Sequence, residues 1–136
     1  MASSQFYPNR AAIIRIVGNR TDAAAKRGAE AGANYARRNI VSDGLIDTGE
    51  MLAGVVVRES PFSTPLRKRY EIVSKAKHTH FQEEGTKGAV AAPGKFLVFK
   101  PKGSATFVFA KKVRGVPAHH FMRRAKLQIR RSDFLP

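Results

Sequence analysis

The fold is decided by the stretch Lys95-Phe96-Leu97-Val98-Phe99-Lys100-Pro101-Lys102-Gly103-Ser104-Ala105-Thr106-Phe107-Val108-Phe109-Ala110, which predicts a β-hairpin. Its two ends are aromatic and β-branched, as strands are. Its middle, residues 100–104, has proline early and glycine late, which is typical of a turn. The apolar residues run almost without interruption, so we expect their side chains to form the core of a sheet. They include Phe96, Val98, Phe107 and Phe109.

A helix is predicted on each side of this hairpin. Residues 78–84 form a turn or two of helix that Gly85 stops, because glycine adopts a positive φ at no steric cost. Pro117 suits the first position of the second helix. The apolar residues of that helix recur at helical spacing and share one face, so it is amphipathic. They are Ala118, Phe121, Met122, Ala125 and Ile129.

The first forty residues predict two helices. Pro8 can start the first one, which Gly18-Asn19 breaks or kinks. Thr21 or Asp22 can cap the second by accepting a hydrogen bond from a free backbone N–H. This second helix is longer and rich in alanine, and it runs to about Arg38.

Gly28 and Gly32 lie inside the second of these helices. Glycine within a helix costs about 0.5–1 kcal/mol relative to alanine. Either the helix approaches a sheet or a neighbouring subunit closely at these positions, or it is a weak helix that merely tolerates them.

Two strands follow, at Leu52–Arg58 and Arg69–Ser74. Two strands of this length are marginal alone, so they need the later hairpin to complete an antiparallel sheet. We predict an α+β fold, in which this sheet packs against a long N-terminal helix and the C-terminal amphipathic helix. The 136 residues suggest one domain, residues 1–136, with a flexible arm at residues 1–7 and a mobile loop at 85–94.

The charge of the chain is strongly positive and unevenly spread. Lys and Arg number 25 against 10 Asp and Glu, a formal charge of +15, and no acidic residue lies between Glu84 and Asp133. Such a block indicates a polyanionic neighbour, either nucleic acid or an acidic protein surface, and a solvated face without a ligand is the plain alternative. DNA would be contacted through its phosphates, because no base-reading motif is present. The candidate contacts are Lys100, Lys102, Lys111, Lys112 and Arg114.

Other classes of function lack their usual residues. Without cysteine, the chain forms no disulfide and no cysteine-ligated zinc site. No apolar run approaches the roughly 18 residues that span a bilayer, and no secretory signal is seen at the N-terminus. Glu83-Glu84 fits a structural helix end better than an acid–base pair. The four histidines, His78, His80, His119 and His120, lack the spacing of a metal-binding helix. We therefore expect no enzymatic activity, no cofactor and no metal.

Three short motifs, in this order and spacing, resemble the head–tail joining proteins of long-tailed bacteriophages, also called neck or tail-completion proteins. They are an Asp-Thr-Gly turn before a strand, an aromatic segment that ends in Glu-Glu-Gly-Thr, and a Pro-x-x-x-Phe-x-x-x-Ala segment after a hairpin. The resemblance covers roughly residues 20–130, although His78-Thr79-His80-Phe81 replaces the usual Tyr-Ala. The motif residues are Asp47, Thr48, Gly49, Glu84, Gly85, Thr86, Pro117, Phe121 and Ala125.

The resemblance implies a structural protein of the virion neck, made in the cytoplasm of the host bacterium. It would form a ring, with sixfold symmetry expected, between the capsid portal assembly and the tail, and DNA would cross its lumen. Its partners would be copies of itself, neighbouring connector proteins, and tail-terminator or tail-tube proteins. The principal alternative is a sequence-independent nucleic-acid-binding protein, whose phenylalanines stack bases on an exposed sheet. A ribosome-associated basic protein is a third, weaker alternative.

Overall fold

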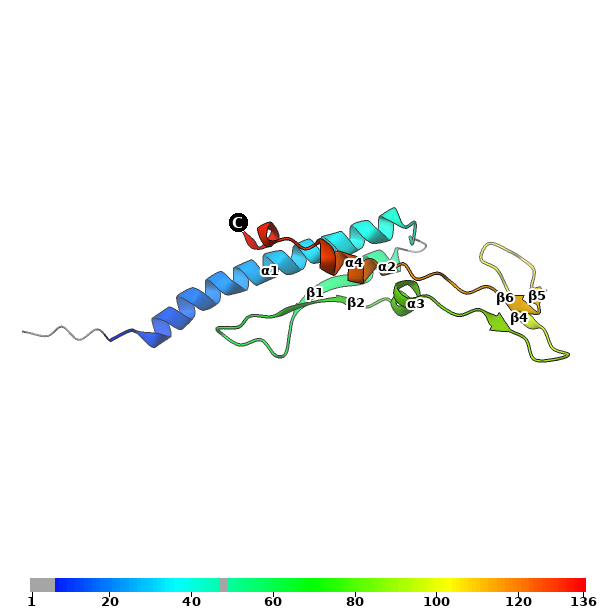
Figure 1. The fold of residues 1–136 in the computed structure, drawn as a ribbon, viewed down its shortest axis with the longest axis horizontal. Helices are drawn as coiled ribbons and strands as arrows, with labels where there is room; N and C mark the ends of the chain where they lie inside the picture. Colours follow the sequence, from blue (N-terminus) through cyan, green and yellow to red (C-terminus); the bar gives the residue numbers. More distant parts are fainter. Residues whose placement is uncertain (1–6, 47–48) are drawn as a thin grey trace, which may run out of the picture. The chain divides into compact units, whose positions relative to one another are not determined.

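Helix α1 runs without a break from Arg10 to Ser42 in this computed structural model, which describes residues 7–46 and 49–136 (Figure 1). Asn9 caps its start, where the side-chain oxygen accepts a hydrogen bond from the Ala12 N–H at 3.1 Å. The predicted division into two helices is wrong. The Thr21 hydroxyl donates to the Val17 carbonyl oxygen at 2.9 Å, so it bonds back into the same helix and caps no new one.

The chain divides into two compact units. Unit 1 comprises residues 1–76 and 122–136, and unit 2 comprises residues 77–121. Together their elements make an α+β fold, with a long N-terminal helix, small antiparallel sheets and a C-terminal helix, as the sequence predicts. The single domain expected from the chain length stays a prediction, which cooperative unfolding of both units would confirm.

In unit 1, α1 covers a two-stranded antiparallel sheet (Figure 1). The sheet pairs β1, Val55–Glu59, with β2, Tyr70–Ser74. Strand β1 begins later than predicted, because Glu50–Gly54 form the short helix α2. The Ile40 and Val55 side chains are fully buried between these elements and form the centre of the core.

The C-terminal segment returns along α1 as helix α4, Phe121–Gln128, and the 3-10 turn η1, Arg131–Phe134 (Figure 1). Gly28 lies under the ring of Phe134, and a Cβ at Gly32 would meet Ile72 Cδ1 at 2.6 Å and Ile129 Cδ1 at 2.7 Å. The two helix glycines therefore allow close packing of side chains from the same chain. Polar contacts hold the segment in place. They are Tyr35 to Asp133 at 3.3 Å, Asn39 to Gln128 at 2.9 Å, and the Arg124–Asp43 ion pair.

Unit 2 consists of short elements. Helix α3 spans Thr79–Glu84 and ends at Gly85, whose φ is +76°. Strand β3, Ala89–Val90, pairs with β6, Lys112–Val113. Strand β4, Leu97–Phe99, pairs with β5, Val108–Ala110, and forms the predicted hairpin.

The hairpin does not complete the sheet of unit 1, so that prediction is wrong. Within the described residues the strands form three separate two-stranded sheets. Strand β3 also lies inside the loop expected at 85–94, where the sequence predicted no strand. The mobility of that loop stays a prediction.

Tyr70 joins β2 to α1 through a strong hydrogen bond. Its hydroxyl donates to Asp22 Oδ1 at 2.5 Å, which raises the pKa of Tyr70 from 10.0 to about 12. Next to it, the hydrogen bond from Arg58, and then the one from Ser60, hold the pKa of Glu71 below its usual range. Both residues thus tie their strand to its neighbours by charge-assisted bonds.

We expect the stability of the fold to fall as the pH rises from about 10 to about 12. The neutral phenol of Tyr70 is favoured in the folded chain, so its contribution is fully present below the unfolded pKa and is lost above it. Ultraviolet titration of the phenolate in wild type and Tyr70→Phe isolates this group. In Asp22→Asn the phenol should titrate at lower pH, and an unchanged midpoint would contradict the assignment.

Candidate functional site

The second and third motifs meet in unit 2, although Thr86 and Val116 are 30 residues apart. The Thr86 N–H donates to the Val116 carbonyl oxygen at 2.9 Å, and the Val116 N–H donates to Thr86 Oγ1 at 2.9 Å. Thr86 therefore satisfies both backbone groups of Val116. The hydroxyl oxygen of Thr86 accepts a backbone hydrogen bond that joins the two segments, which explains a threonine at this position.

Glycines let the two backbones cross at this point. A Cβ on Gly85 would lie 2.7 Å from the Val116 carbonyl oxygen and 2.8 Å from the Ala118 nitrogen. A Cβ on Gly115 would overlap the Thr86 carbonyl oxygen, and a Cβ on Gly88 would overlap the Val113 carbonyl oxygen. We call this contact of residues 85–88 with 113–118 the backbone crossing. Gly88 and Gly115 lie outside the motifs, and no local pattern marks them.

Pro117 does not begin a helix, which corrects the expected role. The backbone N–H groups of His119 and His120 turn to α3 and donate to the carbonyl oxygens of Gln82, at 2.9 Å, and Glu83, at 3.2 Å. They satisfy carbonyls that the end of α3 leaves open. His120 has a φ of +51°, so the helix starts only at Phe121.

The remaining motif residues serve the fold. Phe121 and Ala125 are buried, at 0% and 2% exposure, on the face that helical spacing predicts. Gly49 has a φ of +78° and precedes α2 in unit 1. Glu84 ends α3. Asp47 and Thr48 lie outside the described residues.

The phenylalanines of the hairpin do not form a core, which corrects the expectation from their apolar context. Phe96 is 56% exposed, Val98 55%, Phe107 63% and Phe109 66%. In the register, Val98 pairs with Phe109, and Phe96 and Phe107 each lie directly before a strand, two residues from Val98 and Phe109. Side chains alternate between the faces of a strand, so we place Val98 and Phe109 on one face of the hairpin, with Phe96 and Phe107 continuing that face beyond the strand ends. We call it the aromatic face.

The five candidate cations all lie exposed in unit 2. Lys100 and Lys102 belong to the turn of the hairpin, and Lys112 belongs to β6. Lys111 places its Nζ 5.9 Å from the centroid of the Phe96 ring. Arg114 is part of the backbone crossing. The structure therefore gathers these cations on one unit, and it leaves their ligand open to proposal.

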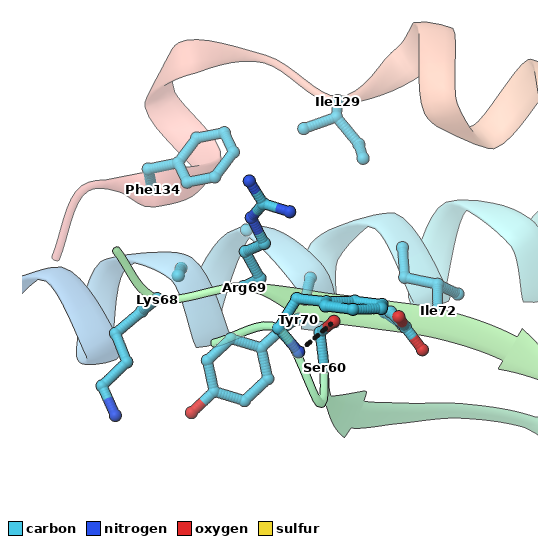
Figure 2. A pocket seen from close by; sticks show the side chains of 12 residues that line it. Ser60, Lys68, Arg69, Tyr70, Ile72, Ile129 and Phe134 are labelled. Atoms are coloured by element: carbon cyan, nitrogen blue, oxygen red, sulfur yellow. Dashed lines mark hydrogen bonds between the residues drawn. The ribbon is translucent and has the colours of Figure 1, made fainter. Parts of the chain in front are cut away.

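Unit 1 contains a groove of about 470 Å³ between α1, β2 and the C-terminal segment (Figure 2). Ile72, Ile129 and Phe134 make it mainly apolar. Arg69 extends toward the segment that carries Ile129 and Phe134, while Lys68 pairs with Glu59 at 3.4 Å. Ser60 and Glu71 are paired in its lining, but the hydrogen bonds from Arg58 and Ser60 hold the pKa of Glu71 below its usual range, which makes this carboxylate a weaker base.

The described part of the chain holds no group of three or more His, Cys, Asp or Glu residues placed to bind a metal ion. Within the same residues, no helix is long and apolar enough to cross a membrane. No protein-family model, curated protein or solved structure matches the chain.

Proposed function

We propose that the chain is a structural subunit of the head–tail connector, or neck, of a long-tailed bacteriophage. Copies of it form a ring, with six as the expected number, that joins the capsid portal assembly to the tail and lets DNA pass. The observation that supports this proposal best is the backbone crossing. There the motif residues Gly85, Thr86 and Pro117 serve architecture, as a non-enzymatic assembly protein requires.

The first half of α1 offers a surface for contact between copies. Ile13, Ile16 and Val17 are 48%, 53% and 41% exposed. Their spacing places them on one face of the helix, so they form an uncovered apolar stripe. Closing a ring requires a heterologous contact, in which this stripe packs against a different surface of the next copy.

The basic surface fits a channel that carries DNA. A ring of copies repeats the charge of +15, which attracts phosphates without reading sequence. The exposed cations Lys100, Lys102, Lys111, Lys112 and Arg114 either line the lumen or meet acidic faces of the adjoining tail-terminator or tail-tube proteins.

We expect a phage without this protein to make filled heads and separate tails that fail to join. Ile16→Glu should reproduce that defect, because it places a carboxylate in the apolar stripe at a subunit contact. Ala11→Glu is the matched control, since it adds the same charge at an exposed position on the opposite side of α1. Electron microscopy of lysates gives the measurement. Normal joined particles in the absence of the protein would refute the proposed function.

A further inference from the structure

The aromatic face, made by Phe96, Val98, Phe107 and Phe109, is the largest gathering of exposed apolar side chains in unit 2. Each of its members is more than half exposed. The other face, with Leu97, Phe99, Val108 and Ala110, is better covered, and Phe99 and Val108 are 38% and 37% exposed. The hairpin is therefore open mainly on one side, and a ligand on that side would remove the rings from water.

The rings are spaced for successive flat ligands. Phe107, directly before β5, and Phe109, inside it, are two residues apart, which separates their Cα atoms by about 7 Å where the chain is extended. Phe96 lies diagonally across from Phe109, at a similar spacing of about 7–8 Å. Three phenyl rings thus line a strip, and every nucleobase has a π-face that stacks on such a ring.

Positive charge surrounds the same strip. Lys111 lies beside the ring of Phe96, and Lys100 directly follows β4, two residues from Val98. Unit 2 as a whole carries eight Lys and Arg residues against Glu83 and Glu84. A ligand on this face should therefore be anionic as well as aromatic.

We propose that the aromatic face binds single-stranded nucleic acid without sequence preference, by stacking bases on Phe96, Phe107 and Phe109 while Lys100 and Lys111 contact phosphates. In a duplex the bases are already stacked, so the rings would gain nothing from it and only the phosphates would attract. A second copy of the chain is a poorer occupant, because it would bring its own positive charge against these lysines. This activity does not depend on ring formation.

Binding of a fluorescent oligothymidylate to the full-length chain, followed by anisotropy, tests the proposal. Phe107→Leu/Phe109→Leu should weaken binding by about tenfold or more for each ring, since leucine keeps apolar bulk and removes the stacking surface. Phe99→Leu, on the other face, should bind as wild type does. Lys100→Gln/Lys111→Gln should flatten the dependence of log affinity on log salt by about 0.7 for each phosphate that the variant no longer neutralises.

Two results would overturn the proposal. In the first, duplex DNA of equal length competes as well as the single strand and the leucine variant binds as wild type, which would leave phosphate attraction alone. In the second, vesicles of anionic phospholipid bind the chain through the phenylalanines and the oligothymidylate does not, which would make the face a membrane surface. Amide exchange of β4 and β5 checks that the variants keep the hairpin. Electron microscopy of phage that carries the leucine variant separates the two proposals. If heads and tails join although binding of the oligothymidylate is lost, the binding activity is distinct from the proposed connector function.

Discussion

Phe121→Ala is expected to lower the free energy of unfolding by about 3–5 kcal/mol, the range for truncating a buried phenylalanine. The Phe121 side chain is 0% exposed, so alanine would lose the burial of the ring and leave a cavity in close-packed surroundings. Denaturant unfolding gives the measurement. Because native stability is only about 5–15 kcal/mol, this one change would remove a large part of it.

Phe107→Ala is the matched control for Phe121→Ala. Its ring is 63% exposed, so the same truncation should change stability by only about 0.5 kcal/mol. This is the opposite of the expectation from sequence, which assigned Phe107 to the core. Equal losses in the two variants would show that the hairpin rings are buried against another part of the chain.

The two phenylalanines show what sequence patterns can predict. Phe121 and Ala125 recur at helical spacing, and a helix with one apolar stripe buries that stripe, so the pattern led to the right residues. The runs around Phe99 and Phe107 also predicted the hairpin correctly. An apolar run, however, does not indicate whether residues of the same chain bury its side chains. Here the side chains of the aromatic face remain exposed.

The glycines show a second limit. Gly18-Asn19 was expected to break or kink the first helix, yet Gly18 lies inside α1. A Cβ on Gly18 would lie 2.7 Å from the Pro65 carbonyl oxygen, so the glycine makes room for that atom. The glycine thus serves a contact 47 residues away in the chain and does not mark a helix end. Gly85 was correctly placed at the end of α3, because a glycine with a positive φ is a common local signal for the end of a helix. Contacts between distant segments, such as the backbone crossing, leave no local signal.

Gly115→Ala should destabilise unit 2 by about 2–4 kcal/mol, the second large effect we expect. The new Cβ would overlap the Thr86 carbonyl oxygen and come within 2.8 Å of the Gly88 nitrogen. Both are backbone atoms, which cannot rotate away as a side chain can, so the two segments must separate. Overpacking typically costs about 1–3 kcal/mol, and each backbone hydrogen bond that breaks adds about 1 kcal/mol.

Hydrogen exchange locates this effect. In Gly115→Ala the N–H groups of Thr86 and Val116, which bond across the backbone crossing, should exchange much faster than in wild type. Gly103→Ala is the control, because Gly103 has a φ of +78° but nothing within 4 Å of its Cβ position. That variant should strain only the hairpin turn and leave both N–H groups protected. Unchanged exchange in Gly115→Ala would mean that the two backbones do not pass this close, and the motif residues would then need another role.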